Sequence, residues 1–246
     1  MDRQVTCLRG RTSDRTAGAG AGAEALARAL DGAVVGERAE PAVRDWSDDL
    51  PTARPVLEAA AAALRDAFDA GALPVLTASD CSICIATLPE VVLREPGVHV
   101  AWIDAHGDFN TPETTPSGFL GGMCLAAACG RWDADGWPGT VDPGHVHLLG
   151  VRDLDPGEQV EAEAAGLSAE VPDGVPLYVH LDTDVLDPSV MAAQFPVPGG
   201  WDARRLHAQL AELAASCRIV GVEITALEDL SAVELVRDAI APLLAG

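Results

Sequence analysis

The sequence predicts an α/β fold, with one three-layer α/β/α domain over residues 1–246 and a mainly parallel sheet. Short runs rich in β-branched residues alternate with Ala- and Leu-rich stretches of helical length. Two apolar runs, 98–103 and 177–181, end abruptly in acidic residues spaced by two. No apolar run approaches the roughly 18 residues that a membrane span needs. These features favour right-handed crossovers, with helices on both faces of the sheet.

The first half of the chain predicts strands that alternate with helices. The clearest helix is 56–69, an Ala-rich run that ends just before Gly71, a residue typical of helix ends. The segment 37–54 contains Pro41 and Pro51 among mixed charges, which favours a surface connection. The expected strands are 5–8, 33–35, 73–77 and 98–103, and the other expected helices are 22–30 and 81–87. Asp80 is expected to cap the helix that begins near Cys81.

The second half continues the alternation after a turn-rich loop that follows Asp108. The stretch 130–144 is rich in Trp, Gly and Pro and is expected to be a loop. Residues 145–151 alternate like a strand, and Asp155-Pro156 opens a helix. The expected strands are 145–151, 177–182 and 218–224, and the expected helices are 123–128, 156–165, 202–216 and 232–244.

The charge of the chain argues against some classes of partner. It has 38 acidic residues against 16 basic ones, all arginine, which gives a formal net charge of −22. This balance argues against binding to nucleic acid or to an anionic membrane. No N-terminal basic and then apolar signal is present, so the expected location is the cytoplasm. Six cysteines in a chain of this length do not form a disulfide framework, and most are expected to be buried thiols.

Metal-competent side chains follow two of the predicted strands. Asp104, His106 and Asp108 follow the first, and Asp182 and Asp184 follow the second. The carboxyl ends of parallel strands are where α/β folds place their chemistry. Such a carboxylate-rich set suits Mn²⁺ or Mg²⁺ better than a soft metal. The alternative, solvated loop acids, is common for one acid but uncommon for two apolar strands that end in the same pattern.

Longer motifs surround these residues. They are D-A-H-x-D-x-N-T-P-x-T-T-x-S-G at 104–118, G-V-R-D-L-D-P-G-E at 150–158, D-x-D-x-L-D-P at 182–188 and P-V-x-G-G at 196–200. From about Thr77 onward the chain resembles the arginase/agmatinase (ureohydrolase) family. The resemblance implies a three-layer α/β fold, a pair of Mn²⁺ ions and hydrolysis of a guanidino group by a metal-activated hydroxide.

The resemblance assigns roles to matching residues. Asp104 and Asp182 match the carboxylates that bridge the two metals, while His106 and Asp184 match ligands of the second metal. Asp108 matches a ligand of the first metal that also orients the attacking hydroxide, so it is a catalytic candidate. Positions for the substrate α-carboxylate match Asn110, Thr115 and Ser117, and positions for its α-amino group match Asp153 and Asp155, with Glu158 nearby. This set implies an arginine-like α-amino acid as substrate, not decarboxylated agmatine.

Three positions depart from the family pattern. Cys81 stands where the family has a histidine that completes the first metal site, and a thiolate is a softer partner for Mn²⁺. The first site is therefore expected to be weak or empty, with Cys81 a poor ligand. Cys81 could also be an inert core thiol, or pair with Cys84 in a C-x-x-C redox motif that nothing else supports.

The other two departures lie at the same end of the expected pocket. Gly121 replaces a histidine that shuttles a proton to the leaving amine in the family, and Ala226 replaces the glutamate that clasps the guanidinium. Glu223 or Glu228 could supply the missing carboxylate, and Glu223 is the second catalytic candidate. These departures predict a substrate whose head group differs from that of L-arginine. Nω-hydroxy-L-arginine fits because its guanidine is less basic. The expected products are L-ornithine and hydroxyurea.

Other functions stay open at this point. One is ordinary arginase activity on L-arginine, and another is a non-catalytic protein that binds an amino acid. A metallophosphoesterase is suggested by G-H-x-H at 144–147, but the other motifs of that class are missing. The expected partner is a small amino-acid substrate, and the chain is expected to be a monomer or a homo-oligomer.

Overall fold

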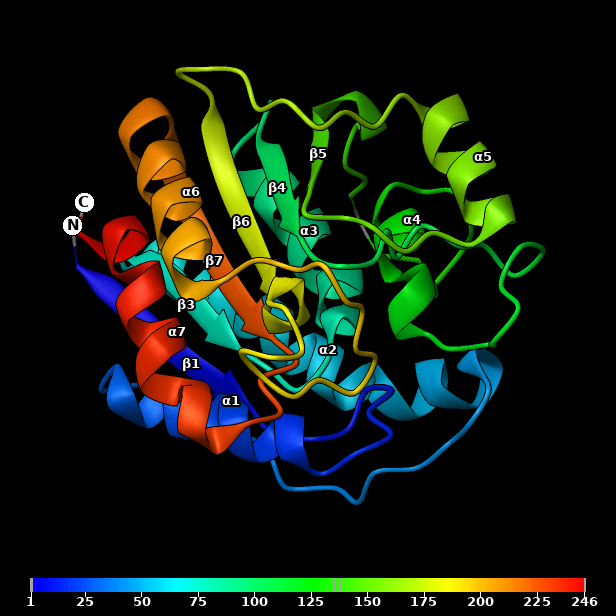
Figure 1. Cartoon of the computed structure of the whole chain (residues 1–246), viewed down its shortest axis with the longest axis horizontal. Helices are drawn as coiled ribbons and strands as arrows, with labels where there is room; N and C mark the ends of the chain where they lie inside the picture. The colour runs from blue at the N-terminus through cyan, green and yellow to red at the C-terminus, as the bar shows by residue number, and fades with distance from the viewer. Residues whose placement is uncertain (1, 135, 138, 246) are drawn as a thin grey trace.

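The computed structural model describes residues 2–134, 136–137 and 139–245, and its centre is one seven-stranded sheet. The strands are β1 (Arg3–Leu8), β2 (Ala33–Val35), β3 (Leu73–Thr77), β4 (His99–Ile103), β5 (Val146–Leu149), β6 (Pro176–Asp182) and β7 (Arg218–Thr225). Neighbouring strands pair in parallel, in the order β2-β1-β3-β7-β6-β4-β5 (Figure 1). The predicted α/β class with a mainly parallel sheet is confirmed.

Helices cover both faces of this sheet. They are α1 (Gly18–Ala29), α2 (Trp46–Asp69), α3 (Cys84–Arg94), α4 (Cys124–Ala128), α5 (Pro156–Ala165), α6 (Ala203–Ser216) and α7 (Val233–Ile240). Buried residues of α1, α6 and α7 pack on one face, and those of α2, α3 and α4 pack on the other (Figure 1). Among the described helices, none has the length and apolar character that crossing a bilayer requires.

The alternation of side chains along the central strands decides which residues reach the site. Trp102 and Tyr178 pack in the layer of α2 and α3, whereas Ile103 and Leu181 pack on the opposite face. Because successive strand residues point to opposite faces, Asp104 continues the face of Trp102. The carboxyl ends of β3, β7, β6 and β4 are neighbours in the sheet, so polar residues that follow them meet at one edge.

One correction concerns α2, which begins at Trp46, inside the segment 37–54 that was expected to be a surface connection. Pro51 and Pro55 lie within this helix. Each proline lacks the N–H that an interior helix position donates, so these residues lowered the helical signal in the sequence. Buried Leu50 and the apolar face that it begins offset this loss through packing against α3 and the sheet.

Helix α1 also begins earlier than expected, at Gly18 and not at Gly22. A Cβ on Gly22 would lie 1.8 Å from the carbonyl oxygen of Leu227, and one on Gly18 would lie 2.1 Å from Oε2 of Glu228. Glycine allows this close approach because it has no Cβ. Helix α1 thus fixes the segment after β7, which forms one wall of the site described below.

Helix α3 runs through Pro89 to Arg94, past the expected end at Thr87. It is preceded by one 3-10 turn at Cys81–Ile83. Asp80 accepts a hydrogen bond from the backbone N–H of Ser82 at 3.0 Å, which confirms that Asp80 caps this segment. The cap fixes the direction in which Cys81 enters the site.

The loop after β1 is held by buried polar contacts. Arg11 and Asp49 form a two-point ion pair, with Nη1 to Oδ1 at 2.5 Å and Nη2 to Oδ2 at 3.0 Å. Ser13 Oγ donates to Asp80 Oδ1 at 2.7 Å. These contacts tie the loop to α2 and to the turn before α3, and they place Arg15 at the site.

Breaking the Arg11–Asp49 pair should destabilise the fold strongly. Their side chains are only 7% and 1% exposed, so Asp49→Ala leaves a buried guanidinium without its counter-ion. We expect a loss of about 3–5 kcal/mol in the free energy of unfolding, measured by urea titration. The control is Asp48→Ala in the same helix turn, where the side chain is exposed and the loss should be below about 1 kcal/mol. Equal losses in the two variants would contradict this account.

Glu24 of α1 should make stability depend on acid pH. The buried Glu24 carboxylate accepts hydrogen bonds from Arg9 Nε and Arg38 Nε, both at 2.7 Å, and these lower its pKa from 4.5 to about 2. A lowered pKa gives stability that is complete above the unfolded value and is lost as the pH falls from about 4.5 to about 2.

The comparison for this prediction is Glu24→Gln. Because Arg38 is 69% exposed and therefore screened, we expect the variant to lose about 1–2 kcal/mol at neutral pH. This difference should shrink steadily on acidification toward pH 2, as followed by urea unfolding at several pH values. A difference that stays constant over that range would show that Glu24 is not ionised through these contacts.

Candidate metal and substrate site

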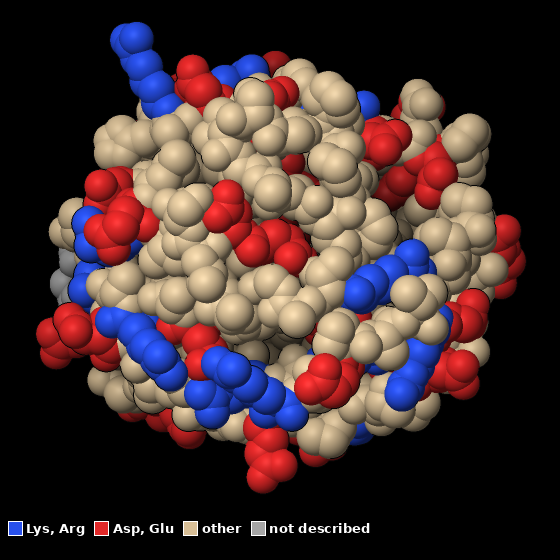
Figure 2. All heavy atoms as spheres, turned by 60° about the horizontal axis from the view of Figure 1, so that its bottom comes forward, with Lys and Arg blue, Asp and Glu red and all other residues tan. Residues whose placement is uncertain are grey.

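A cavity of about 410 Å³ lies at the carboxyl ends of the central strands. Its walls come from the residues after β3, β4, β6 and β7, from the loops 117–122 and 194–197, and from Arg15. On the face drawn in Figure 2, arginine side chains lie between acidic ones. The interior of the cavity is more one-sided, because most of its charged residues are carboxylates.

Two similar turns hold the acidic residues. After β4, the N–H of His106 donates to Asp104 Oδ1 at 2.7 Å, and after β6 the N–H of Asp184 donates to Asp182 Oδ1 at the same distance. The two turns are joined, because the N–H of Ala105 donates to Asp184 Oδ1 at 3.2 Å. The repeated spacing of two residues in the sequence thus produces one compact cluster.

The imidazole of His106 lies between two of these carboxylates. Its Nδ1 is 3.1 Å from Asp184 Oδ2 and 3.4 Å from Asp104 Oδ1. Burial opposes a charged imidazolium, but the hydrogen bonds and charges of Asp104 and Asp184 outweigh it and raise the pKa of His106 to about 12. In the absence of a metal, His106 is therefore the local counter-charge of the cluster.

The single positive charge of the His106 imidazolium does not balance the negative charge of the remaining carboxylates. Burial first, and then the charge of neighbouring acids, raises the pKa of Asp108 and of Asp182 well above the usual range. Asp108 also has a backbone φ of 51°, a conformation that costs free energy for a residue with a Cβ. A bound cation would offset the charge of this cluster, whereas the φ of Asp108 is held by the fold.

The donor atoms fit a hard divalent cation. Asp104, His106 and Asp184 each place one ligand atom within 4.8 Å of the other two, and so do Cys81, Asp104 and His180. Carboxylate oxygens and imidazole nitrogens are ligands that Mn²⁺ accepts. Asp104 belongs to both groups, which is the arrangement expected of a residue shared by two metals.

Cys81 lies next to this cluster, as the sequence indicated. Its thiol donates to Asp182 Oδ2 at 2.8 Å and lies 3.1 Å from Thr225 Oγ1. Burial, followed by the charge of Asp182 and its neighbours, raises the pKa of the Cys81 thiol well above its usual value. None of the six cysteines, all of them within the described residues, forms a disulfide. Whether Cys81 binds metal stays a prediction.

The six predicted substrate residues divide into two sets. Ser117, Asp153 and Glu158 line the cavity. Burial raises the pKa of Glu158 to about 7, and its carboxylate accepts from the N–H of Phe109 at 2.8 Å and of Asp155 at 3.0 Å. Glu158 therefore joins the loop after β4 to the start of α5.

The other three predicted substrate residues do not line the cavity as this structure describes it. Asn110 donates from Nδ2 to Asp155 Oδ2 at 3.0 Å, and Asp155 forms a capping box at the start of α5. Thr115 accepts from the N–H of Gly118 at 3.1 Å. Their side chains are engaged in holding the loop that carries Ser117.

Glu223 was expected to supply a carboxylate to the substrate head group, and this prediction is wrong. Its side chain is fully buried below the cavity. It accepts hydrogen bonds from Thr87 Oγ1 at 2.7 Å and Tyr178 OH at 2.8 Å, and it lies 2.7 Å from His180 Nδ1. Glu228, the other candidate, does line the cavity and accepts a hydrogen bond from Thr16.

Residues that the sequence analysis did not single out close the head-group end. A Cβ on Gly121 would lie 2.5 Å from Phe119 Cε1, so this ring occupies the space of the missing side chain. The guanidinium carbon of Arg15 lies 4.7 Å above the Phe119 ring and 5.8 Å from that of Phe195. No local pattern marks Arg15, because only the fold brings it beside residues a hundred positions away.

The fold and the site together define an α/β protein with a carboxylate-rich, metal-competent cavity at its strand ends. The sequence model described as Arginase family matches residues 9–173 and 165–230. The chain belongs to the arginase family, and it is accordingly a hydrolase of the amidinohydrolase class.

Individual relatives agree with this assignment. The chain is 38% identical over 254 residues to the N(omega)-hydroxy-L-arginine amidinohydrolase of Streptomyces lavendulae, covering 96% of this chain and 92% of the relative. The arginase of Bacillus caldovelox superposes with a TM-score of 0.80 at 26% identity, over 98% of each chain. The arginase of Entamoeba histolytica, solved in complex with L-ornithine, has the same fold, with a TM-score of 0.83 at 20% identity over 100% of each chain.

Mn²⁺ should stabilise this protein through the acidic cluster. At a free Mn²⁺ concentration of about 100 times the Kd, binding should add about 2.7 kcal/mol, or roughly 5–11 °C in the midpoint of thermal unfolding. Differential scanning fluorimetry with and without a chelator measures this shift. Asp104→Asn should abolish it, whereas Asp173→Asn, which changes an exposed acid before β6, should leave it intact. The same shift in both variants would place the metal elsewhere.

Proposed function

We propose that this chain uses Mn²⁺ to hydrolyse the guanidino group of an arginine-like α-amino acid, with Nω-hydroxy-L-arginine as its preferred substrate. The products are L-ornithine and hydroxyurea. One observation carries the proposal: the cavity is altered at the head-group end, at Cys81, Gly121 and Ala226, while Ser117 and Asp153 line the same cavity. The similarity to a hydrolase named for that substrate supports the same choice.

The residues of the acidic cluster would have separate roles in this hydrolysis. When bound, the two divalent cations supply a hydroxide at neutral pH and polarise the substrate. Asp104 and Asp182 would contribute to both metal sites, and His106 and Asp184 to the second. Asp108, buried against the cluster, would orient the attacking water toward the guanidino carbon.

The α-amino acid end of the substrate would be held by polar groups at the cavity wall. Asp153 would accept hydrogen bonds from the α-ammonium group, with the Glu158 carboxylate beside it. The hydroxyl of Ser117, on the loop 117–122, would donate to the α-carboxylate. An amine without a carboxylate, such as agmatine, would leave this hydroxyl unpaired and bind weakly.

The head-group end explains the preference for a hydroxylated guanidine. Ala226 offers no carboxylate, and the cation Arg15 lines the same cavity. A fully charged guanidinium would therefore be poorly compensated, whereas a less basic hydroxyguanidine is accepted in its neutral form. Glu228, whose pKa is raised by burial, is the carboxylate in the cavity wall that could accept from the N-hydroxyl group.

The resemblance implies a proton-carrying histidine near the head group, and this chain has glycine at that position. Gly121 carries no titratable group, and the Phe119 ring fills the space beside it. The reaction breaks the bond between the guanidino carbon and the δ-nitrogen and adds one water across it. The ornithine amine takes up the proton, and hydroxyurea is released as a neutral molecule.

Broader aspects of the proposal rest on the same resemblance. Residues 1–246 would form one catalytic domain, acting in the cytoplasm as a monomer or a homo-oligomer. We also propose that the reaction serves antibiotic biosynthesis, on the route to D-cycloserine. Nucleic acid and membranes are not among the proposed partners.

The direct test is steady-state release of L-ornithine by the Mn²⁺-loaded protein with three substrates in parallel. We expect kcat/KM for Nω-hydroxy-L-arginine to exceed that for L-arginine at least about tenfold, or about 1.4 kcal/mol, and agmatine to give no detectable amine product. Ala226→Glu, which restores a carboxylate at the head-group end, should shift the ratio toward L-arginine.

The control for this assay is Asp104→Asn, which should abolish turnover of every substrate. Faster turnover of L-arginine than of the hydroxylated substrate would make the protein an arginase in the ordinary sense. Binding of Mn²⁺ without turnover of either would leave a protein that binds an amino acid and does not act on it.

A further inference from the structure

We propose that His180 is a metal ligand, and that its Nε2 binds the cation next to Cys81. The side chain of His180 points from β6 into the layer of α2 and α3, two residues before Asp182 in the same strand. It was not among the predicted ligands. The inference rests on the metal site proposed above and adds to it a histidine that the family pattern does not contain.

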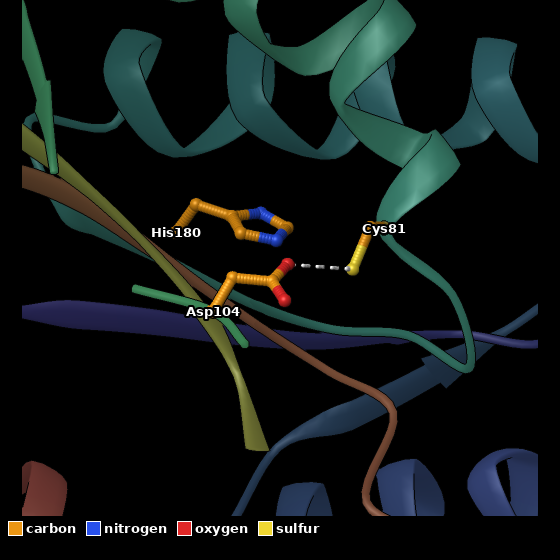
Figure 3. A group of neighbouring side chains, drawn as sticks. All are labelled: Cys81, Asp104 and His180. Carbon is orange, nitrogen blue, oxygen red and sulfur yellow. Dashed lines mark hydrogen bonds between the residues drawn. The ribbon is translucent and has the colours of Figure 1, made fainter. Parts of the chain in front are cut away.

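The position of the ring supports this role. The side chain of His180 is fully buried, and its ligand atom lies within 4.8 Å of those of Cys81 and Asp104. Figure 3 shows the Nε2 edge of the ring turned toward the Asp104 carboxylate and the Cys81 thiol. Nε2 has no hydrogen-bond partner among the described residues. A buried polar atom without a partner costs about 1–3 kcal/mol, so a ligand is missing at this point.

The other ring nitrogen is held in the manner of a metal-bound histidine. Nδ1 lies 2.7 Å from Glu223 Oε1. Glu223 also accepts hydrogen bonds from Tyr178 OH and Thr87 Oγ1, so it is the acceptor at these contacts and is placed to accept the proton of Nδ1–H as well. The remaining lone pair is then on Nε2, directed at the cluster. A carboxylate behind the imidazole is the usual support of a metal-binding histidine.

Packing fixes the ring in this orientation. The ring of Trp102 stacks on His180 with centroids 3.5 Å apart and planes inclined by only 3°. Trp102 precedes Asp104 by two residues on β4, so the same strand holds the ring and supplies a bridging carboxylate. A ligand that does not need to reorganise on binding costs less free energy.

Cys81 is the other possible ligand beside His180. Its thiol is engaged with Asp182 Oδ2 and Thr225 Oγ1 and is a softer donor than Mn²⁺ prefers. The imidazole that the family places at the start of α3 is absent here, and the structure offers one from β6 in its place. Glu223, wrongly expected at the substrate, thereby gains a role as the residue that positions His180.

The test is the nitrogen coordination of Mn²⁺, read by electron spin echo envelope modulation on the holoprotein. We expect two imidazole couplings, from His106 and His180, both changed when the histidines are labelled with ¹⁵N. His180→Gln should remove one coupling and raise the Mn²⁺ dissociation constant of one site about 10–100-fold, measured by equilibrium dialysis. The control is His207→Gln on α6, which is exposed and should change neither.

A second variant keeps the test decisive if His180→Gln does not fold. His106→Gln leaves His180 as the histidine within reach of the cluster, so one imidazole coupling should persist in it. Loss of every imidazole signal in that variant would overturn the inference. So would a spectrum and an affinity that are unchanged in folded His180→Gln, and this result would leave the proposed substrate untouched. Absence of Mn²⁺ binding to the unaltered protein would overturn both proposals together.

Discussion

The mutual repulsion of buried carboxylates is the constraint on which the site depends. Four aspartates crowd into one end of a parallel sheet because two neighbouring strands each end in an acid-rich turn. His106 alone does not neutralise them, and burial, together with the charge of the neighbouring acids, raises the pKa of Asp108 and of Asp182. The fold tolerates this arrangement because the sheet is covered on both faces and because β6 pairs without a register shift with β4, and with β7 from Tyr178 to Asp182. Binding of a pair of cations would be favourable because it offsets the repulsion between these carboxylates.

The two ends of the cavity differ in the chemical groups that they present. Asp153 and Ser117 offer the charge and hydrogen bonding that an α-amino acid requires. At the other end, the Phe119 ring fills the space beside Gly121, Ala226 offers no carboxylate, and the Arg15 guanidinium lines the same cavity. This asymmetry is the physical basis for the proposed change of head group.

The sequence predicted what local pattern determines. The strand ends with D-x-H and D-x-D, the cap at Asp80 and the parallel sheet follow from spacing and alternation, and they are confirmed. The start of α2 was missed because prolines weaken the helical signal, while the packing that offsets them is tertiary. Glu223 was misplaced because it lies two residues before Thr225 at the end of β7, level with His180, so its side chain is buried beneath the cavity. Arg15 and His180 contact residues that are distant in the chain, so no local sequence motif predicts their positions.

A crystal structure of the Mn²⁺-loaded protein with L-ornithine, collected at the manganese absorption edge, tests the account most directly. The account predicts two anomalous peaks, about 3.5–4 Å apart, both beside Asp104 and Asp182. It also predicts the ornithine α-amino group at Asp153, and one peak within bonding distance of His180 Nε2. A single peak away from Asp104, or ornithine bound with its α-amino group toward Ala226, would contradict it.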